Sequence, residues 1–121
     1  MDTMKNRQSE GNCIISEDVI ATIASTAALE IPGVAAMAQR PDLRARLGNN
    51  AAKSVKVTNG ETETVLDVYL NLKLGAQIQS VCGEVQRNVK VAVQSMTGKE
   101  VSAVHVHVMG LAVEGESSEA Q

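Results

Sequence analysis

Two histidines near the end of the chain are the residues whose type and spacing could do chemistry. His105 and His107 are the only histidines, and they stand two residues apart in the apolar stretch VSAVHVHVMGLAV, residues 101–113. Side chains two apart on a strand project from the same face, so the pair could bind a metal ion or transfer a proton. Zinc, however, needs three or four protein ligands, and the sequence has no third histidine and no ligand-spaced cysteine pair.

A carboxylate from a neighbouring strand could complete such a site, and Asp67 is the one candidate on the exposed side of a predicted hairpin. The other interpretation is that the histidines belong to the uncovered face of a strand and meet solvent or a protein partner. We favour the uncovered face and predict no metal and no cofactor. A small metal-binding protein that uses the His105/His107 strand is kept as an alternative.

Other catalytic arrangements find little support in the sequence. No serine lies in a G-x-S-x-G motif, and no glycine cluster matches G-x-x-x-x-G-K-S/T or G-x-G-x-x-G. Cys13 and Cys82 are isolated thiols, which favours a reducing, cytoplasmic setting, and Cys82 is expected to pack as a small apolar residue. We therefore predict no catalytic residue and a protein that is not an enzyme.

Composition narrows the possible partners. Tyr69 is the only aromatic residue in 121, and the formal net charge is −3. Without aromatic side chains to stack on bases, and without a positive field, the chain is not expected to bind nucleic acid. Its apolar runs are only a few residues long, so direct membrane insertion is not expected either.

The elements that must position these residues form one predicted domain over 13–113. Residues 1–12 are polar and 114–121 form an acidic tail, and both are expected to lack fixed structure. Residues 13–15 form a short strand candidate, and Ser16 can cap a helix that Pro32 and Gly33 end. The apolar face of this helix is expected at Val19, Ile20, Ile23, Ala24, Ala27, Ala28 and Ile31.

A hairpin and a second helix follow. Asn59-Gly60 is a strong turn signal, and the return strand alternates between an apolar set and a polar set. The apolar set is Leu66, Val68, Leu70, Leu72 and Leu74, and the opposite set is Asp67, Tyr69, Asn71 and Lys73. The second helix lies within 78–97, with Gly98 as its C-terminal cap and an apolar stripe of Val81, Val85, Val89, Ala92 and Met96.

In the last strand, Val104, Val106 and Val108 are expected to face the helices, which leaves the histidines on the other side. The predicted fold class is therefore α+β in two layers. A small, mainly antiparallel sheet carries two main helices on one face, in the order strand, helix, hairpin, helix, strand.

The connector QRPDLRARLGNNAAKS concentrates positive charge. Arg40, Arg44 and Arg46 flank or occupy a short helix predicted between Pro41 and Gly48. These arginines have two interpretations, a solvated helix or a surface for an acidic ligand or a lipid-synthesis enzyme, and we favour the solvated helix.

Three blocks of sequence resemble a known family. They are ISEDVIATIASTAALEIPGVAAM, then VLDVYLNLKLGAQIQSVCGEVQRNVKVAVQSMTG, and finally VSAVHVHVMGL. Their order and spacing are similar to those of the alkaline shock protein family, small envelope-stress proteins of Gram-positive bacteria. His107 falls on the family's histidine position, whereas His105 falls on a variable one. AQIQS stands where the family commonly has a proline, which leaves the start of the second helix open.

The resemblance implies a non-enzymatic cytoplasmic protein that self-associates and sits near the membrane through protein partners. Some members are associated with the control of fatty-acid synthesis, so the alternative is a regulatory partner of an acetyl-CoA carboxylase type enzyme. Combined with the uncovered sheet face, the resemblance suggests a homo-oligomeric interaction module that docks on a membrane-anchored partner. Tyr69, His105 and His107 are the predicted partner-binding residues, with the three arginines as a weaker set.

Overall fold

Two helices and four strands follow one another in the computed structural model, which describes residues 13–41, 53–60 and 63–113. Their order is α1 (Glu17–Leu29), β1 (Val34–Met37), β2 (Val55–Asn59), β3 (Thr64–Lys73), α2 (Ile78–Thr97) and β4 (Val101–Ala112). The predictions made for 1–12, for 114–121 and for a helix after Pro41 concern segments outside the described residues, apart from Pro41 itself.

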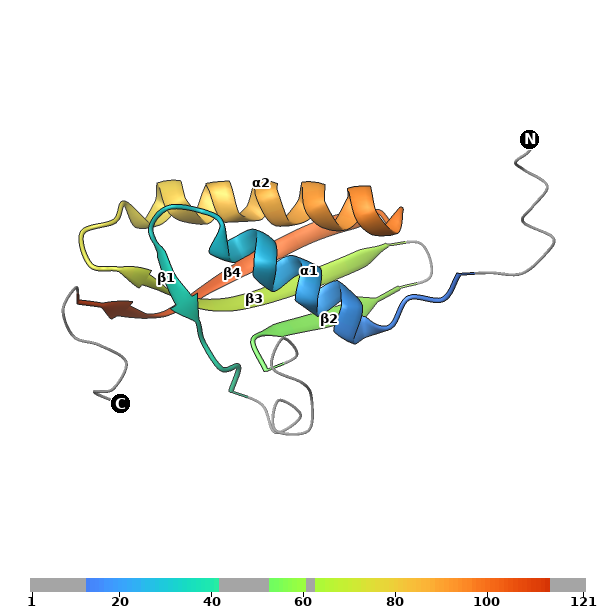
Figure 1. Ribbon diagram of the computed structural model, residues 1–121, viewed down its shortest axis with the longest axis horizontal. Coiled ribbons are helices and arrows are strands. Elements are labelled where there is room, and N and C mark those ends of the chain that lie inside the picture. Colours follow the sequence, from blue (N-terminus) through green and yellow to red (C-terminus); the bar gives the residue numbers. More distant parts are fainter. Residues whose placement is uncertain (1–12, 42–52, 61–62, 114–121) are drawn as a thin grey trace.

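Strand β3 is the centre of the sheet, because every other strand pairs with it (Figure 1). On one edge, β2 pairs antiparallel with the first part of β3 (Val55 opposite Val68) and β1 pairs antiparallel with the last part (Met37 opposite Leu70). On the other edge, β4 runs parallel to β3. Two of the three pairings are thus antiparallel, and the parallel one is possible because α2 carries the chain back to the start of the sheet.

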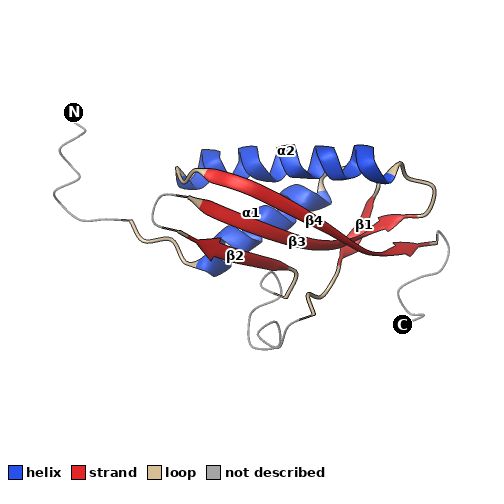
Figure 2. Ribbon diagram, turned by 180° about the vertical axis from the view of Figure 1, so that it is seen from behind, coloured by secondary structure: helices blue, strands red, loops and turns tan. Residues whose placement is uncertain are grey.

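Both helices cover the same face of this sheet. Helix α1 packs against β1 and β2, and α2 packs against α1 and β4. Seen from behind, the strands pass in front of α1, while α2 runs along the upper edge of the picture (Figure 2). The predicted two-layer α+β architecture is confirmed.

Short-range signals in the sequence define the ends of these elements. The Ser16 hydroxyl accepts a hydrogen bond from the Val19 N–H at 3.3 Å and so caps α1. Gly98 ends α2 in the left-handed conformation, with φ of 77°. The hairpin reverses between Asn59 and Thr64, as the Asn59-Gly60 signal predicts.

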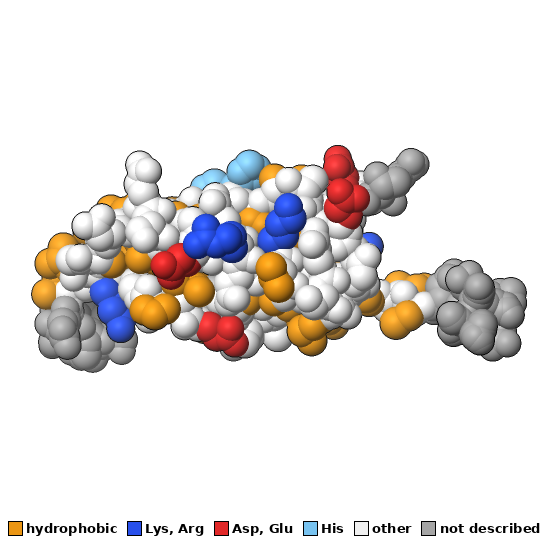
Figure 3. Space-filling model, turned by 90° about the horizontal axis from the view of Figure 1, so that it is seen from above, with side chains coloured by type: hydrophobic (Ala, Val, Ile, Leu, Met, Phe, Trp, Pro, Cys, Tyr) orange, Lys and Arg blue, Asp and Glu red, His pale blue; other side chains and the backbone are white. Residues whose placement is uncertain are grey.

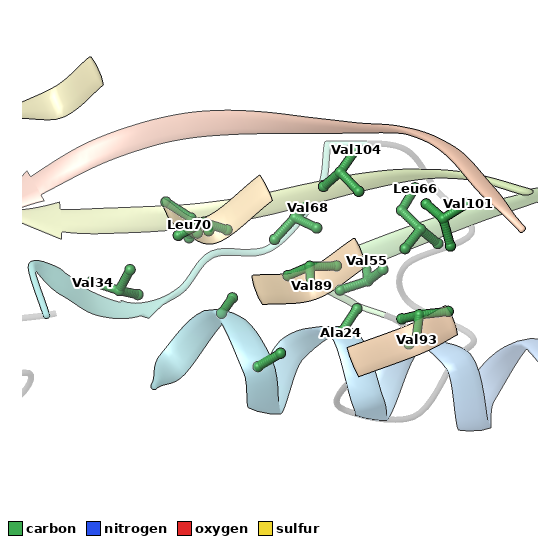
Figure 4. Packing of buried hydrophobic residues seen from close by; sticks show 14 of the residues in the cluster. Ala24, Val34, Val55, Leu66, Val68, Leu70, Val89, Val93, Val101 and Val104 are labelled. Atoms are coloured by element: carbon green, nitrogen blue, oxygen red, sulfur yellow. The ribbon is translucent and has the colours of Figure 1, made fainter. Parts of the chain in front are cut away.

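The hydrophobic cluster between the two layers consists of aliphatic side chains (Figure 4), and Thr64 and Ser54 are the polar residues buried beside it in the described part of the chain. The sheet contributes leucines and valines, and the helices contribute mainly alanines from α1 and valines from α2. The four β3 residues Leu66, Val68, Leu70 and Leu72 are each 0% exposed. The small alanines let α1 approach the sheet and α2 closely, which compensates for the absence of large aromatic side chains.

The strand predicted at Cys13–Ile15 is wrong. These residues have no strand pairing, and the first strand is β1, which follows α1. The reason is that β1 and β2 together occupy this edge of β3, so no place is left there for a strand before α1. Ile15 instead packs against the core from a loop.

The predicted helix stripes are correct in part. Val19 and Met96 are exposed, at 47% and 70%, whereas Ala21 and Val93 are buried in their place. In α2 the buried valines recur every four residues, from Val81 to Val93, so the stripe drifts around the helix and leaves Met96 outside it. Leu74, placed on the apolar set of β3, lies just beyond the end of the strand and is 59% exposed.

Gly33 provides a test of how closely the layers are packed. Its φ is +103°, and a Cβ there would lie 2.8 Å from the Val81 Cγ2 atom. We expect Gly33→Ala to lower the free energy of unfolding by about 2–4 kcal/mol in urea denaturation, because backbone strain and overpacking add. Gly75→Ala is the matched control, since Gly75 has φ of +99° but nothing within 4 Å of the added Cβ. Gly75→Ala should lower the free energy of unfolding by only about 1–2 kcal/mol. Equal losses for the two variants would contradict the close packing at Gly33.

Candidate functional site

The sheet face opposite the helices, called here the open face, carries a band of polar and aromatic side chains. It collects the residues of each strand that alternate with the core residues. They are Asp67, Tyr69 and Asn71 on β3, His105 and His107 on β4, Lys56 and Thr58 on β2, and Ala36 on β1. Figure 3, seen from above, shows histidine side chains at the molecular surface.

Three of these residues form a cluster at the centre of the open face. The His107 Nε2 atom lies 2.9 Å from the Asp67 Oδ1 atom, within hydrogen-bond distance. The His107 ring stacks on Tyr69, with ring centroids 4.3 Å apart and an interplanar angle of 9°. Tyr69 and His107 are direct neighbours in the β3–β4 register, whereas the contact to Asp67 is diagonal.

The cluster is partly open to solvent. The side chain of His107 is 39% exposed and that of Asp67 is 21% exposed. A hydrogen-bonded pair at this exposure contributes little to stability, about 0–1 kcal/mol. Its main effect is geometric, because the carboxylate and the tyrosine ring together fix the orientation of the imidazole.

His105 does not join this cluster. It is exposed and lies beside Asp67 in the strand register, on the same face. Among the residues that the structure describes, no group of three His, Cys, Asp or Glu side chains could hold a metal ion. The third ligand that the metal alternative requires is therefore not found in this part of the chain.

Arg40 is tied to the sheet edge. Its Nη1 donates to the Val55 carbonyl at 3.0 Å, and its backbone N–H donates to the Lys53 carbonyl at 2.7 Å. One of the three arginines singled out in the connector thus has a structural role, joining the chain after β1 to β2. Arg44 and Arg46 lie outside the described residues.

The two thiols differ in environment. Cys13 is exposed, whereas Cys82 is half-buried in α2. Burial raises the pKa of the Cys82 thiol above its ordinary value, because desolvation disfavours the thiolate. This lowers its reactivity at neutral pH and agrees with its predicted role as a small packing residue.

The sequence predicts that Tyr69 and His107 lie on one face, but it does not predict that they are in contact. Alternation alone gives the face of each residue, and only the register of the parallel β3–β4 pair makes them neighbours. The contact between Asp67 and His107 was likewise not predicted, although Asp67 had been singled out as a candidate metal ligand.

The fold and this surface define a small two-layer α+β protein with one helix-covered face and one open face. Residues 5–113 match the model of the alkaline shock protein family, which is described as having a cell envelope-related function, and the chain belongs to this family. The resemblance found in the sequence is thereby confirmed.

Related proteins are found in Gram-positive bacteria. The uncharacterized protein Spy1614 of Streptococcus pyogenes serotype M6 is 32% identical over 120 residues, covering 95% of this chain and 99% of its own length. The uncharacterized proteins YqhY and YloU of Bacillus subtilis are 31% and 30% identical, covering 92% and 88% of this chain and 84% and 93% of their own.

Solved structures of the MamM CTD share the fold. A manganese form has a TM-score of 0.50 at 13% identity, covering 78% of this chain and 99% of that one. A copper form has a TM-score of 0.52 at 11% identity, covering 80% and 100%. At this level of identity the likeness concerns the fold alone.

A helix that spans a membrane must be both long and apolar. Across residues 13–41, 53–60 and 63–113, neither helix is both long enough and apolar enough to cross a bilayer.

The stack between Tyr69 and His107 predicts energetic coupling. We expect Tyr69→Ala and His107→Ala each to lower the free energy of unfolding slightly, with the double variant losing less than the sum. The coupling should be about 0.5–1 kcal/mol, as for aromatic pairs at partly exposed sites. Urea denaturation of the four proteins in the cycle measures it, and strict additivity would contradict the stacked geometry.

Proposed function

We propose that this protein is a non-enzymatic interaction module of the cell envelope, which self-associates and binds a membrane-anchored protein through the open face. One observation carries the proposal. The only aromatic residue of the chain, Tyr69, lies on the open face and not in the core, stacked on His107. Tyrosine is enriched among the residues that dominate binding energy at protein interfaces, because it combines a large rigid surface with a polar tip.

The surroundings of the cluster favour close approach by a partner. Around Lys56 and His105, which are the register partners of Asp67, further positions of the open face carry short side chains, at Ala36, Thr58, Val65 and Ala103. On β4, Gly110 lies against Asn71 of β3. A Cβ added at Gly110 would be 3.2 Å from the Asn71 Oδ1 atom. A sheet face with one central aromatic pair suits a protein partner better than a small ligand, which requires a concave site.

The contact between Asp67 and His107 also has an enzymatic interpretation, since a carboxylate can orient a catalytic imidazole. That role needs the second ring nitrogen to face a nucleophile or a substrate. Within the described residues, no serine or cysteine is hydrogen-bonded to His107, and one face of its ring is covered by Tyr69. We therefore assign Asp67 an orienting role within a binding surface.

The cellular setting of the proposal rests on the family. Membership brings a cell envelope-related function, and a protein of this family can act at the membrane through a partner that is itself anchored there. Cytoplasmic location near the membrane, participation in the envelope stress response and homo-oligomerisation are parts of this proposal. The alternative, regulation of a fatty-acid synthesis enzyme through the connector arginines, then rests on Arg44 and Arg46, because Arg40, the one connector arginine among the described residues, binds the backbone of β2.

Self-association is tested by sedimentation velocity on the full chain over a wide range of concentration. We expect the mean sedimentation coefficient to rise with concentration, because edge strands can pair between copies. A strict monomer at the highest concentration would contradict this part of the proposal.

Partner binding is tested by fractionation of cells of a Gram-positive host that produces the protein or a variant in place of its relative. We expect Tyr69→Ala and His107→Ala to reduce the membrane-associated share several-fold, since aromatic anchors dominate interface energy. Val91→Ala is the matched control, because Val91 is 59% exposed on the helical side. Equal membrane association of all four proteins would contradict the proposal.

A further inference from the structure

The outer edge of β4 is covered unequally along its length. In the described part of the chain, β4 pairs with β3 only. Near the start of the strand, the Val101 N–H donates to the Gln94 Oε1 at 3.0 Å, and the Gln86 Nε2 donates to the Val104 carbonyl at 3.2 Å. Two glutamine side chains of α2 therefore satisfy backbone groups of β4 that β3 does not reach.

This cover ends halfway along the strand. Gln86 lies eight residues before Gln94, and toward the start of α2 the side chains nearest to the side of Gln86 are those of Cys82 and Gln79. Because α2 runs opposite to β4, these two residues lie toward the second half of the strand, but within the described residues neither is hydrogen-bonded to the β4 backbone, unlike Gln86 and Gln94. The segment 106–112, called here the open edge, is thus left without the glutamine contacts that cover the first half.

Apolar side chains surround the open edge. Met109 and Leu111 are 49% and 47% exposed, Val113 is 42% exposed, and Leu74 and Ile78 are 59% and 45% exposed. Leu74 and the end of β4 adjoin each other, because the Leu74 N–H donates to the Ala112 carbonyl at 2.9 Å and Leu111 pairs with Leu72. Hydrophobic side chains gather at this end of the molecule in Figure 3. Single exposed apolar residues are ordinary, but a group on adjoining segments indicates an interface.

We infer that the open edge pairs antiparallel with the open edge of a second copy of this chain, about a two-fold axis perpendicular to the sheet. The inference rests on the self-association proposed above and identifies the surface that performs it. The whole of β4, VSAVHVHVMGLA, contains no Asp, Glu, Lys, Arg or Pro. Two copies can therefore face each other without like-charge repulsion and without a missing N–H donor, which are two of the usual protections of an edge strand. A third, a bulge, is present at Met109, where the register with β3 shifts.

Other occupants of the open edge fit less well. Residues 114–121, EGESSEAQ, follow it directly in the chain, but they contain three glutamates and no β-branched or large apolar residue, so they are poorly suited to form an added strand. The same glutamates, next to the apolar end, disfavour an anionic lipid surface. A second copy, by contrast, supplies an identical uncharged strand and apolar patch, as an isologous interface requires.

This geometry also has a consequence for the open face. A two-fold axis perpendicular to the sheet keeps the helices of both copies on one side. The two open faces then form one continuous surface, with a Tyr69–His107 pair in each half. Self-association would thus present two copies of the proposed partner-binding cluster on the same side of the assembly.

Sedimentation velocity on the full-length wild type and variants tests the inference. Leu111→Lys places a charge at the open edge, and Val91→Lys places the same charge on the far side of α2, where Val91 is 59% exposed. We expect Leu111→Lys to weaken self-association roughly tenfold or more, because a lysine there opposes strand addition. Val91→Lys should associate as the wild type does. If circular dichroism shows that Leu111→Lys does not fold, Val113→Lys takes its place.

Hydrogen exchange provides the second measurement. In the wild type, backbone amides of 106–112 should exchange more slowly in concentrated than in dilute solution, while those of β2 should not change with concentration. One outcome would overturn the inference but leave the proposed function standing. In that outcome the wild type associates, Leu111→Lys or Val113→Lys associates equally well, and hydrogen exchange in 106–112 does not depend on concentration. A wild type that stays monomeric would overturn self-association and the inference together.

Discussion

The alternation of side chains along β3 is the constraint on which the rest of the structure depends. Leu66, Val68, Leu70 and Leu72 have no exposed surface, and the residues between them point to the other face. A shift of one residue would bring Asp67 and Tyr69 under the helices, where the carboxylate would lose its solvation. Because every other strand pairs with β3, its apolar face determines which side the helices cover, and its polar face determines what the protein presents to partners.

Local signals predicted much of this fold. The Ser16 cap, the Gly98 cap, the hairpin at Asn59-Gly60 and the alternation of β3 each depend on residues close together in sequence, and each is present in the structure. Tertiary packing decided the rest. The segment 34–37 is only four residues long and two of them are alanines, so VAAM carries no clear strand signal. It forms a strand because it pairs with the edge of β3. The irregularities at Ser102 and Met109, which are unpaired in the β3–β4 register, could not be predicted from the sequence either. The first lets Val101 and Val104, three residues apart, both reach the core.

The distribution of chemistry over the molecule supports a binding role. Aliphatic side chains make up the hydrophobic core, while the chain's one aromatic residue and both histidines lie on β3 and β4 outside it. Family membership supplies the cell envelope as the setting, and the shared fold with the MamM CTD adds no function, because one fold serves many roles. Two separate surfaces follow from this arrangement. The open edge of β4 is suited to a second copy, and the open face is suited to a partner of a different kind.

Oxidative footprinting in living cells, followed by mass spectrometry, tests most directly whether the open face is the occupied surface. Tyr69 reports on the open face, and Met96, 70% exposed on α2, serves as an internal reference on the helical side. The account predicts that Tyr69 is oxidised much more slowly in cells than in dilute purified protein, while Met96 is oxidised equally in both. Protection of Met96 with unchanged oxidation of Tyr69 would show that the partners meet the helical layer, and would contradict the account.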